Sequence, residues 1–163
     1  MAEPSATLRD PAHRVSPRAP YLWLLGASFR SLFVAGVGVL AVLAWGASIP
    51  TWAWIAYVVA AVAYTLVMPQ FRYRVHRWET TETAVYTQRG WLSRERRIAP
   101  MSRVQTVDFQ QTVVARLFGL ASVTVTTASA AGPLQIEDLD ADVAQRLVDD
   151  LTRRAEADRG DAT

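Results

Sequence analysis

The side chains with the greatest capacity for chemistry are five arginines within residues 89–103. They are Arg89, Arg94, Arg96, Arg97 and Arg103. A guanidinium group binds phosphate or carboxylate through two parallel hydrogen bonds, so this cluster predicts an anion-binding surface. Arg94 and Arg96 alternate along the chain and are expected to share one face of a strand, with Arg97 on the opposite face.

The same arginines have a second explanation, because they follow a long apolar stretch of the chain. Membrane proteins concentrate basic residues beside their spans on the cytoplasmic side, and these charges set the topology without any ligand. A basic patch of this kind gains about 1 kcal/mol per charge near an anionic leaflet. The sequence therefore leaves open whether the five arginines bind an anionic lipid or only fix the topology.

Residues that act as nucleophiles, general bases or metal ligands are scarce. The sequence has no Cys and no Lys, and its two histidines are His13 and His76. Thiolate chemistry, thiolate metal sites and Schiff bases are therefore excluded. Asp149 and Asp150 are neighbours that point in different directions on a helix, so they form no acid–base pair. We expect no enzyme activity, no cofactor and no metal ion, and a cryptic enzyme is the least favoured alternative.

The elements that position these residues begin with a membrane hairpin. No charged residue occurs between Arg30 and Arg72, and Pro50 divides this stretch into two apolar runs, 32–49 and 51–68. Each run would extend roughly 27 Å as a helix, close to the hydrocarbon thickness of a bilayer. The sequence therefore predicts two transmembrane helices joined by a short turn.

Aromatic and charged residues at the ends of the two runs predict how they are placed. Trp45, Trp52 and Trp54 surround the turn, as in an interfacial aromatic belt. Four arginines precede the hairpin and three follow it closely, whereas the turn has none. The positive-inside rule then puts both termini in the cytoplasm. The apolar residues 20–29 are expected to form a separate interfacial helix that lies against the membrane.

The rest of the chain divides into a tail, a mixed domain over 71–157 and a frayed end over 158–163. Residues 1–19 contain several prolines and are expected to be a flexible N-terminal tail. Alternating and β-branched residues predict six strands in the mixed domain. The predicted strands are 73–79, 84–89, 92–98, 104–109, 122–128 and 134–137.

Two helices are predicted among and after these strands. Residues 112–118 form a short helix that stops at Gly119, a common C-terminal signal. Over 140–155, apolar residues such as Leu147 and Leu151 recur every four positions and give one apolar face. A helix of this kind would cover an open end or edge of a small sheet or barrel.

Residues 98–128 combine several motifs in a fixed order. These are a Pro, an Arg-Val-Gln strand, paired Gln, a short helix that ends in a large apolar residue with Gly-Leu, and a Thr/Val-rich strand. The residues that form them are Pro100, Arg103, Val104, Gln105, Gln110, Gln111, Leu117, Phe118, Gly119, Leu120, Val123, Val125 and Thr127. With the two spans and the last helix, residues 20–155 resemble the bacterial pleckstrin-homology-like (bPH2) domain membrane proteins, the YdbS-like family.

The resemblance implies an α+β fold. A two-helix transmembrane hairpin would be followed by a PH-like curved antiparallel β-sheet or barrel of six to seven strands, capped by a C-terminal helix. Such proteins are often encoded near a larger membrane protein with several copies of the same domain, which implies a hetero-complex. Gln105, Gln110 and Gln111 recur in the family and would either satisfy backbone groups at a bend or line a partner surface.

Together these observations predict a membrane-anchored, non-enzymatic PH-like domain that serves as a protein-binding or scaffold module in a membrane complex. Its expected partners are the lipid bilayer and another membrane protein with related PH-like domains, and self-association is left open. The alternative is recognition of an anionic lipid headgroup by the five arginines. We expect no nucleic-acid binding, because the sequence has no recognition helix or aromatic stacking motif.

Overall fold

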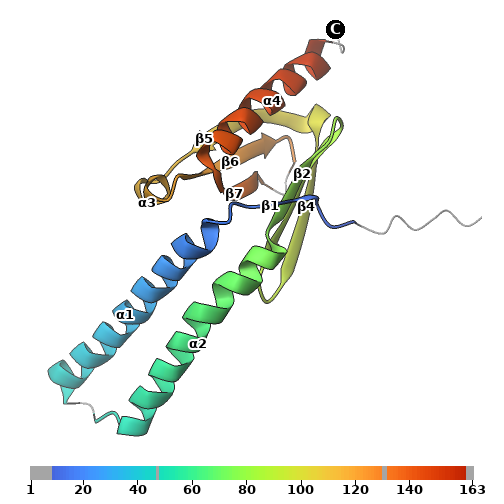
Figure 1. Cartoon of the computed structure of the whole chain (residues 1–163). Helices are drawn as coiled ribbons and strands as arrows, with labels where there is room; N and C mark the ends of the chain where they lie inside the picture. Colours follow the sequence, from blue (N-terminus) through green and yellow to red (C-terminus); the bar gives the residue numbers. More distant parts are fainter. Residues whose placement is uncertain (1–8, 47, 130–131, 161–163) are drawn as a thin grey trace, which may run out of the picture.

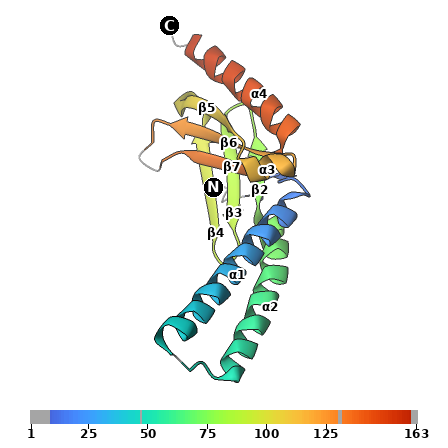
Figure 2. The ribbon, with the colours of Figure 1, turned by 90° about the vertical axis from the view of Figure 1, so that its left-hand side faces the viewer.

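The computed structural model describes residues 9–46, 48–129 and 132–160, which form a long helical hairpin and a globular head (Figure 1). The helices are α1 (Ala19–Trp45), α2 (Thr51–Val75), α3 (Val113–Leu117) and α4 (Ala141–Gly160). The strands are β1 (His13–Arg14), β2 (Arg77–Thr80), β3 (Ala84–Gly90), β4 (Arg94–Pro100), β5 (Val104–Gln110), β6 (Leu120–Thr127) and β7 (Leu134–Asp140). A 3-10 turn, η1 (Met101–Arg103), joins β4 to β5. Figure 2 shows that α1 and α2 extend from one end of the head, which consists of β1–β7, α3 and α4.

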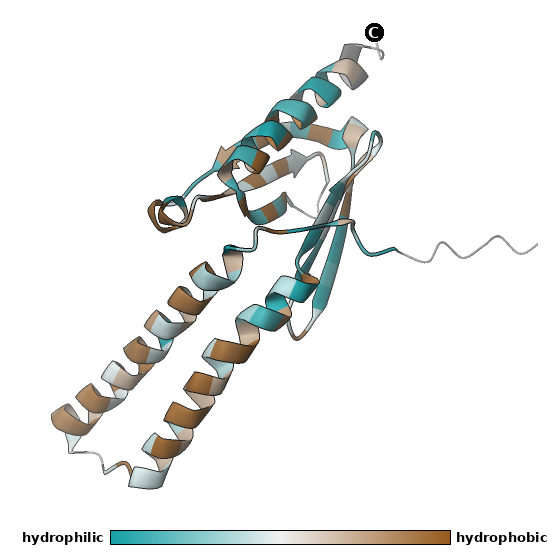
Figure 3. Cartoon of the chain, viewed as in Figure 1, coloured by the Kyte–Doolittle hydropathy of each residue, from teal (hydrophilic) through white to brown (hydrophobic). Residues whose placement is uncertain are grey.

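The hairpin has the polarity expected of a membrane segment. Both α1 and α2 are long and apolar enough to cross a bilayer, and only 6% of the most apolar stretch of each is buried. Figure 3 shows hydrophobic residues along most of both helices. α1 ends at Gly46, whose left-handed φ of 63° stops the helix, and α2 begins after the extended Pro50.

The expected separate helix over 20–29 is not present, because these residues form the first turns of α1 without a break. Ala19, Trp23 and Ala27 are buried on one side of α1, in a small core that includes Met68 of α2. Two of these three residues are alanines, which allow the helix backbones to approach closely. The apolar character of the segment therefore reflects, in part, helix packing at the base of the head.

Two antiparallel sheets form the head, in the orders β1-β2-β3-β4 and β5-β6-β7. This arrangement confirms the predicted PH-like fold. β3 and β4 form a long hairpin that ends at the Gly90↔Arg94 pair. The largest error in strand position concerns residues 73–75, which complete α2 because the N–H of His76 still donates to the carbonyl of Arg72 at 2.8 Å.

The core of the head lies between the sheets and α4. Its buried side chains include Val85 of β3, Val123 of β6 and Ile136 of β7. α4 adds Leu147 and Leu151, the residues whose four-residue spacing predicted an apolar face. The helix packs over β5 and β6 and so covers the sheet as expected.

α4 is longer than the sequence predicts. The frayed end is expected from residue 158, but the helix continues to Gly160, and residues 161–163 lie outside the described residues. Residues 156–160 contain no large apolar side chain, so the apolar spacing that predicts the helix gives no signal for its last turn.

The expected flexible tail over 1–19 is wrong for its described part, residues 9–19, whose last residue already begins α1. β1 pairs with β2 in an antiparallel ladder, and the N–H of Ser16 donates to the carbonyl of Asp138 at 3.0 Å. β1 is therefore the seventh strand. Because β1 precedes the hairpin and β2 follows it, their pairing places both ends of the hairpin on the same side of the membrane. Residues 1–8 lie outside the described residues.

Candidate functional site

A cavity of about 380 Å³ lies where the hairpin meets the head. Its walls come from α1, α2, the turn between β3 and β4, and β7. We name it the base cavity, and its lining residues are Arg30, Tyr64, Met68, Arg72, His76, Arg89, Gly90, Trp91, Ser93, Glu95 and Glu137. Three arginines and two glutamates meet here, so the junction between hairpin and head is strongly charged.

The turn between β3 and β4 closes one side of the base cavity. Gly90 has a φ of 127°, and a Cβ there would lie 1.8 Å from a backbone oxygen of the same turn, so only glycine fits. The ring of Trp91 meets Tyr64 of α2 edge-on, with centroids 5.7 Å apart. Leu92, beside it, is 83% exposed. The tip of the turn thus contacts α2 at a residue inside the predicted span 51–68.

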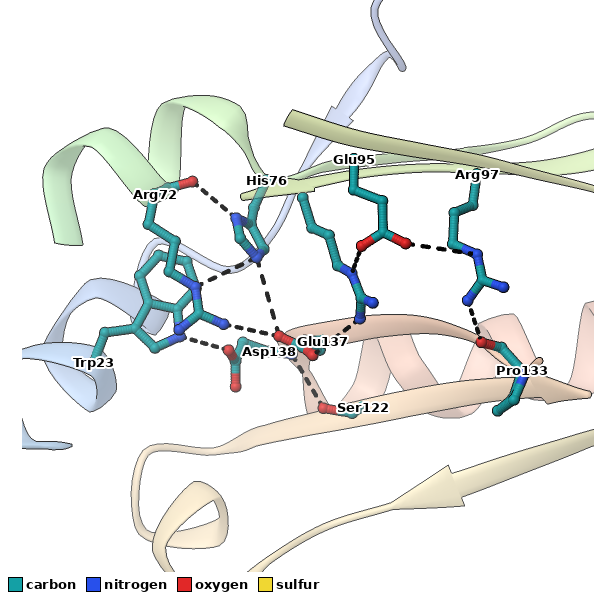
Figure 4. Close-up of polar contacts among 10 residues, drawn as sticks. Trp23, Arg72, His76, Glu95, Arg97, Ser122, Pro133, Glu137 and Asp138 are labelled. Atoms are coloured by element: carbon teal, nitrogen blue, oxygen red, sulfur yellow. Dashed lines mark hydrogen bonds and ion pairs between the residues drawn. The ribbon is translucent and has the colours of Figure 1, made fainter. Parts of the chain in front are cut away.

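Arg72 of α2 is held by three neighbours: Trp23 of α1, Glu137 of β7 and His76, which follows α2 (Figure 4). Its Nη2 donates to Glu137 Oε2 of β7 at 2.8 Å. Its Nε lies 3.3 Å from His76 Nε2, and its guanidinium stacks over the ring of Trp23 from α1, 4.3 Å from the centroid. This single arginine therefore links both membrane helices to the second sheet.

His76 is neutral in this environment. Burial, with the charge of Arg72 as the second cause, lowers the pKa of His76 from 6.5 to about 4. In the neutral form Nδ1 donates to the carbonyl oxygen of Arg72 at 3.1 Å, and Nε2 accepts from the Arg72 side chain. At pH 7 the uncharged ring is therefore held by two hydrogen bonds to Arg72 and packs between that residue and the head.

Asp138 lies next to this group in a strained backbone conformation. Its φ of 57° falls in the left-handed region, which Asp tolerates better than most residues. Burial raises the pKa of its carboxyl, and the hydrogen bond from Trp23 Nε1 at 2.7 Å opposes that shift. Its N–H donates to Ser122 Oγ at 3.2 Å. Asp138 thus attaches the first turns of α1 to β7.

The two other arginines of the base cavity, Arg89 and Arg30, differ in whether a carboxylate pairs with them. Arg89 Nε donates to Glu95 Oε2 at 2.9 Å, which lowers the pKa of that carboxyl, and its Nη1 lies 3.8 Å from Glu137. Arg30 of α1 lies over the ring of Tyr64, 5.8 Å from the centroid. Within the described part of the chain, no carboxylate lies within ion-pair distance of Arg30.

The five arginines predicted as a binding cluster do not form one site. Arg89 lines the base cavity, whereas Arg96, Arg97 and Arg103 line a second cavity of about 230 Å³ between β4 and the facing ends of β6 and β7. Arg94 lines neither of these two cavities. Arg94 and Arg103 are exposed, so they remain accessible to solvent.

Two arginines of β4 are bound within the protein. Arg96 Nε donates to Gln88 Oε1 at 2.8 Å, and its guanidinium also pairs with Asp10. Arg97 donates to the carbonyl oxygen of Pro133 at 2.6 Å. Their partners lie on opposite sides of β4, as the alternation along the strand predicts. These contacts reduce the number of cluster guanidinium groups that are open to an external anion.

The three predicted glutamines also separate. Gln111, just before α3, donates from Nε2 to the carbonyl oxygen of Leu120 at 2.8 Å and so satisfies a backbone group where β6 begins after α3. Gln105 and Gln110 are exposed on β5. β5 is an end strand of its sheet, and its outer edge pairs with no other strand among the described residues.

α3, which follows β5, presents apolar side chains to the outside. Val113 and Leu117 are each 81% exposed, although Ala115 between them is buried. The Thr112 side chain accepts from the N–H of Ala115 at 3.2 Å and caps the helix. We name this region the α3–β5 surface, and its residues are Phe109, Gln110, Val113, Val114 and Leu117.

Sequence reasoning missed most of the base cavity. Trp23, Arg72, Glu137 and Asp138 meet only because α1, α2 and β7 pack together, and no motif in the sequence links them. Arg30 did leave a signal, because it is an isolated charge between two apolar stretches. Among the residues that the structure describes, no group of three His, Asp or Glu side chains is placed to hold a metal ion.

Comparisons with known proteins agree with this architecture. A family model described as "Bacterial PH domain" matches residues 25–155. The UPF0699 transmembrane protein YdbS of Bacillus subtilis (strain 168) is 28% identical over 155 residues, which cover 90% of this chain and 94% of the relative. No solved structure matches the chain. The transmembrane relative and the two apolar helices identify a membrane protein with two spans. The chain belongs to the bacterial PH domain family.

Proposed function

We propose that this chain is a membrane-anchored, non-enzymatic docking module that binds another membrane protein through its α3–β5 surface. The observation that carries the proposal is the exposure of Val113 and Leu117 on a helix beside an unpaired strand edge. Adjacent exposed apolar side chains mark interaction sites, and a free strand edge accepts a strand from a partner.

A partner with related PH-like domains suits this surface. Such a domain would carry an equivalent strand edge and an equivalent short helix, so that two apolar faces would be buried against each other. In this proposal the partner is also a membrane protein, and the two spans of this chain would hold both proteins in one bilayer. A second copy of the chain has the same surface and is distinguished by experiment.

In this proposal the head and both termini face the cytoplasm. Arg72, Arg74 and Arg77 follow the hairpin directly, and basic residues concentrate on the cytoplasmic side of spans. The turn between the spans has no charge. Because β1–β2 pairing joins both ends of the hairpin, an orientation established for one end holds for the other.

Photo-crosslinking of the full chain in its native membrane tests the docking proposal. A photo-reactive residue replaces Gln110 on the α3–β5 surface or, as a control, the exposed Asp149 on α4. We expect an adduct with a membrane protein that contains PH-like domains at position 110 and none at position 149. The double change Val113→Asp and Leu117→Gln should reduce this adduct at least tenfold, whereas Arg116→Gln on the same helix should leave it within twofold.

Three outcomes would count against docking of this kind. Equal adducts at positions 110 and 149 would indicate random collision. An adduct that survives the double change would remove the α3–β5 surface from the interaction. Recovery of a second copy of this chain alone would replace the hetero-complex with a homodimer.

Recognition of an anionic lipid is a second candidate function, although not through the five arginines as a cluster. Arg89, Arg96 and Arg97 are bound to other groups of the protein. What favours lipid binding is instead the base cavity with Arg30, whose guanidinium has no carboxylate partner among the described residues.

A further inference from the structure

The α2 residues that line the base cavity run from Tyr64 and Met68, inside the predicted span 51–68, to the charged Arg72. Figures 1 and 2 both show the β3–β4 tip beside the membrane helices, and its Trp91 contacts Tyr64. Tyr64 precedes Arg72 by eight residues in α2, which corresponds to about 12 Å along the helix axis. Arg30, stacked over Tyr64, is therefore much closer to the bilayer centre than Arg72.

A charge at this depth needs an explanation. Ionisable residues within membrane segments are costly, face the protein interior or a water-filled cavity, and mark functional sites. Arg30 lies just before the predicted span 32–49 and adds to the basic residues of that flank, but the positive-inside rule does not require its side chain to line a cavity. Arg30 lines the base cavity, so its guanidinium lies among polar side chains and not in the hydrocarbon of the bilayer.

The charges in the cavity are distributed unequally. Arg72 and Arg89 share Glu137, and Arg89 also binds Glu95. These carboxylates neutralise the end of the cavity nearest the head. Arg30, at the end nearest the membrane, lies over the face of Tyr64 and has no carboxylate partner among the residues that the structure describes. The cavity therefore combines an open guanidinium with two further arginines nearby, which is a set of donors that attracts an anion.

The shape of the cavity suits part of a lipid. Its volume of about 380 Å³ is large enough for a phosphate with a small polar substituent. Tyr64 and Trp91 form its aromatic rim, and such residues sit at the level of lipid headgroups. The exposed Leu92 at the tip and the apolar outer surface of α2 lie where acyl chains would begin.

We propose that the base cavity binds the phosphate of an anionic membrane phospholipid, with Arg30 as its principal contact and Trp91 and Tyr64 flanking the headgroup. The guanidinium donates two hydrogen bonds to the phosphate oxygens. The acyl chains stay in the bilayer against the hairpin. This site is separate from the α3–β5 surface. The inference rests on the second candidate function, lipid recognition, and does not depend on the docking proposal.

The test uses the purified full chain in a mild non-ionic detergent and short-chain lipids as probes. Binding of dioctanoyl phosphatidylglycerol is measured by native mass spectrometry and by the shift in melting temperature. We expect Arg30→Gln to weaken binding about tenfold, and Arg30→Lys, which keeps the charge but loses the fork, to weaken it less. Arg94→Gln, a control at an exposed arginine outside the cavity, should leave binding within twofold.

Two further probes separate the sources of the phosphate group. Dioctanoyl phosphatidylcholine carries a phosphate without net negative charge, and inorganic phosphate carries the charge without acyl chains. We expect both to bind at least tenfold more weakly than the phosphatidylglycerol probe. Equal binding of inorganic phosphate would assign the cavity to a soluble anion and overturn the lipid site.

Other results would also overturn the proposal. Equal lipid affinity of Arg30→Gln and the unaltered chain would show that Arg30 makes no contact with the headgroup. Equal losses in Arg30→Gln and Arg94→Gln would point to general charge attraction. Arg30 is exposed, so its variants should melt like the unaltered chain without lipid. If Arg30→Gln does not fold, Arg30→Lys with lipid affinity equal to that of the unaltered chain is the overturning result.

Discussion

The head buries its large apolar side chains, whereas the hairpin exposes them. In the head, Leu120, Ile136 and Leu151 are buried almost completely, whereas Leu43 and Val59 of the hairpin are exposed. Figure 3 shows the contrast, with polar residues over much of the head and hydrophobic residues along the helices. Each region is therefore suited to its own solvent, because water drives apolar side chains inward and lipid does not.

This difference in side-chain exposure places the base cavity at the boundary between the water around the head and the lipid around the hairpin. Arg72, His76 and Glu137 line this cavity, and Asp138 lies beside them. Polar groups gather there because neither an apolar core nor a lipid-facing surface offers hydrogen-bond partners to charged side chains. Buried polar groups of this kind must be paired with one another. Here the pairing also fixes the head to the hairpin, so the position of the head relative to the membrane follows from side-chain contacts.

The largest effect should come from the core of the head. Leu151→Ala removes a completely buried side chain of α4 from the cluster between the sheets. We expect a loss of about 3–4 kcal/mol in the free energy of unfolding, as for other buried leucines. Urea unfolding of the detergent-solubilised chain measures it. Leu92→Ala, at an exposed leucine, should change this free energy by less than about 0.5 kcal/mol, and similar losses in both variants would refute the assigned core.

A charge on the outside of the hairpin should have the next largest effect. Val59 is 63% exposed near the middle of the predicted span 51–68, where an arginine would meet lipid. Val59→Arg should cost about 3 kcal/mol of membrane insertion, which an insertion assay in microsomes measures. Val113→Arg, at an exposed valine of the head, should leave insertion unchanged. If both variants insert like the unaltered chain, the outer surface of α2 faces water and the comparison between the regions fails.

The smallest effect should come from the boundary itself, as a dependence of stability on pH. Because burial lowers the pKa of His76 to about 4, the unfolded chain binds more protons between pH 6.5 and pH 4. The contribution of His76 is therefore complete above pH 6.5 and is lost as the pH falls. We expect about 1 kcal/mol of lost stability between pH 7 and pH 5.5.

Two substitutions test the source of this pH dependence. His76→Gln should remove it, whereas His13→Gln, at the exposed histidine of β1, should leave it intact. Asp138 acts in the opposite direction, because its raised pKa lets the folded chain bind more protons at the acid end of the range. An unaltered pH profile in His76→Gln would mean that another group is responsible.

The sequence alone predicts those elements in which each face of the helix or strand has the same surroundings from end to end. The two spans follow from an uncharged stretch, and α4 follows from the spacing of Leu147 and Leu151. Both signals are local, because a helix repeats its contacts every few residues. The six strands of the mixed domain were found in the same way, although the first of them is shorter than predicted.

Other parts of the fold depend on neighbours that are distant in the sequence. β1 has only two residues, lies among prolines and becomes a strand because β2 offers it an edge. The arginines of residues 89–103 are close in sequence but diverge in space, since alternate residues of β4 bond on opposite sides. Arg30 and Arg89 meet at one cavity although a whole membrane hairpin separates them in the chain.

The pairing of β1 with β2 has a consequence for biosynthesis. The two strands lie on either side of the hairpin in the sequence, so β1 has no partner strand until both spans and β2 have been made. At about 5–20 residues per second, this delay lasts several seconds. The antiparallel helices then bring the two ends together and remove most of the entropic cost of closing so long a loop. β1 can therefore pair with β2 only when both ends of the inserted hairpin lie on the same side of the membrane. A head made without residues 9–75 would lack both this strand and the Trp23 partner of Asp138.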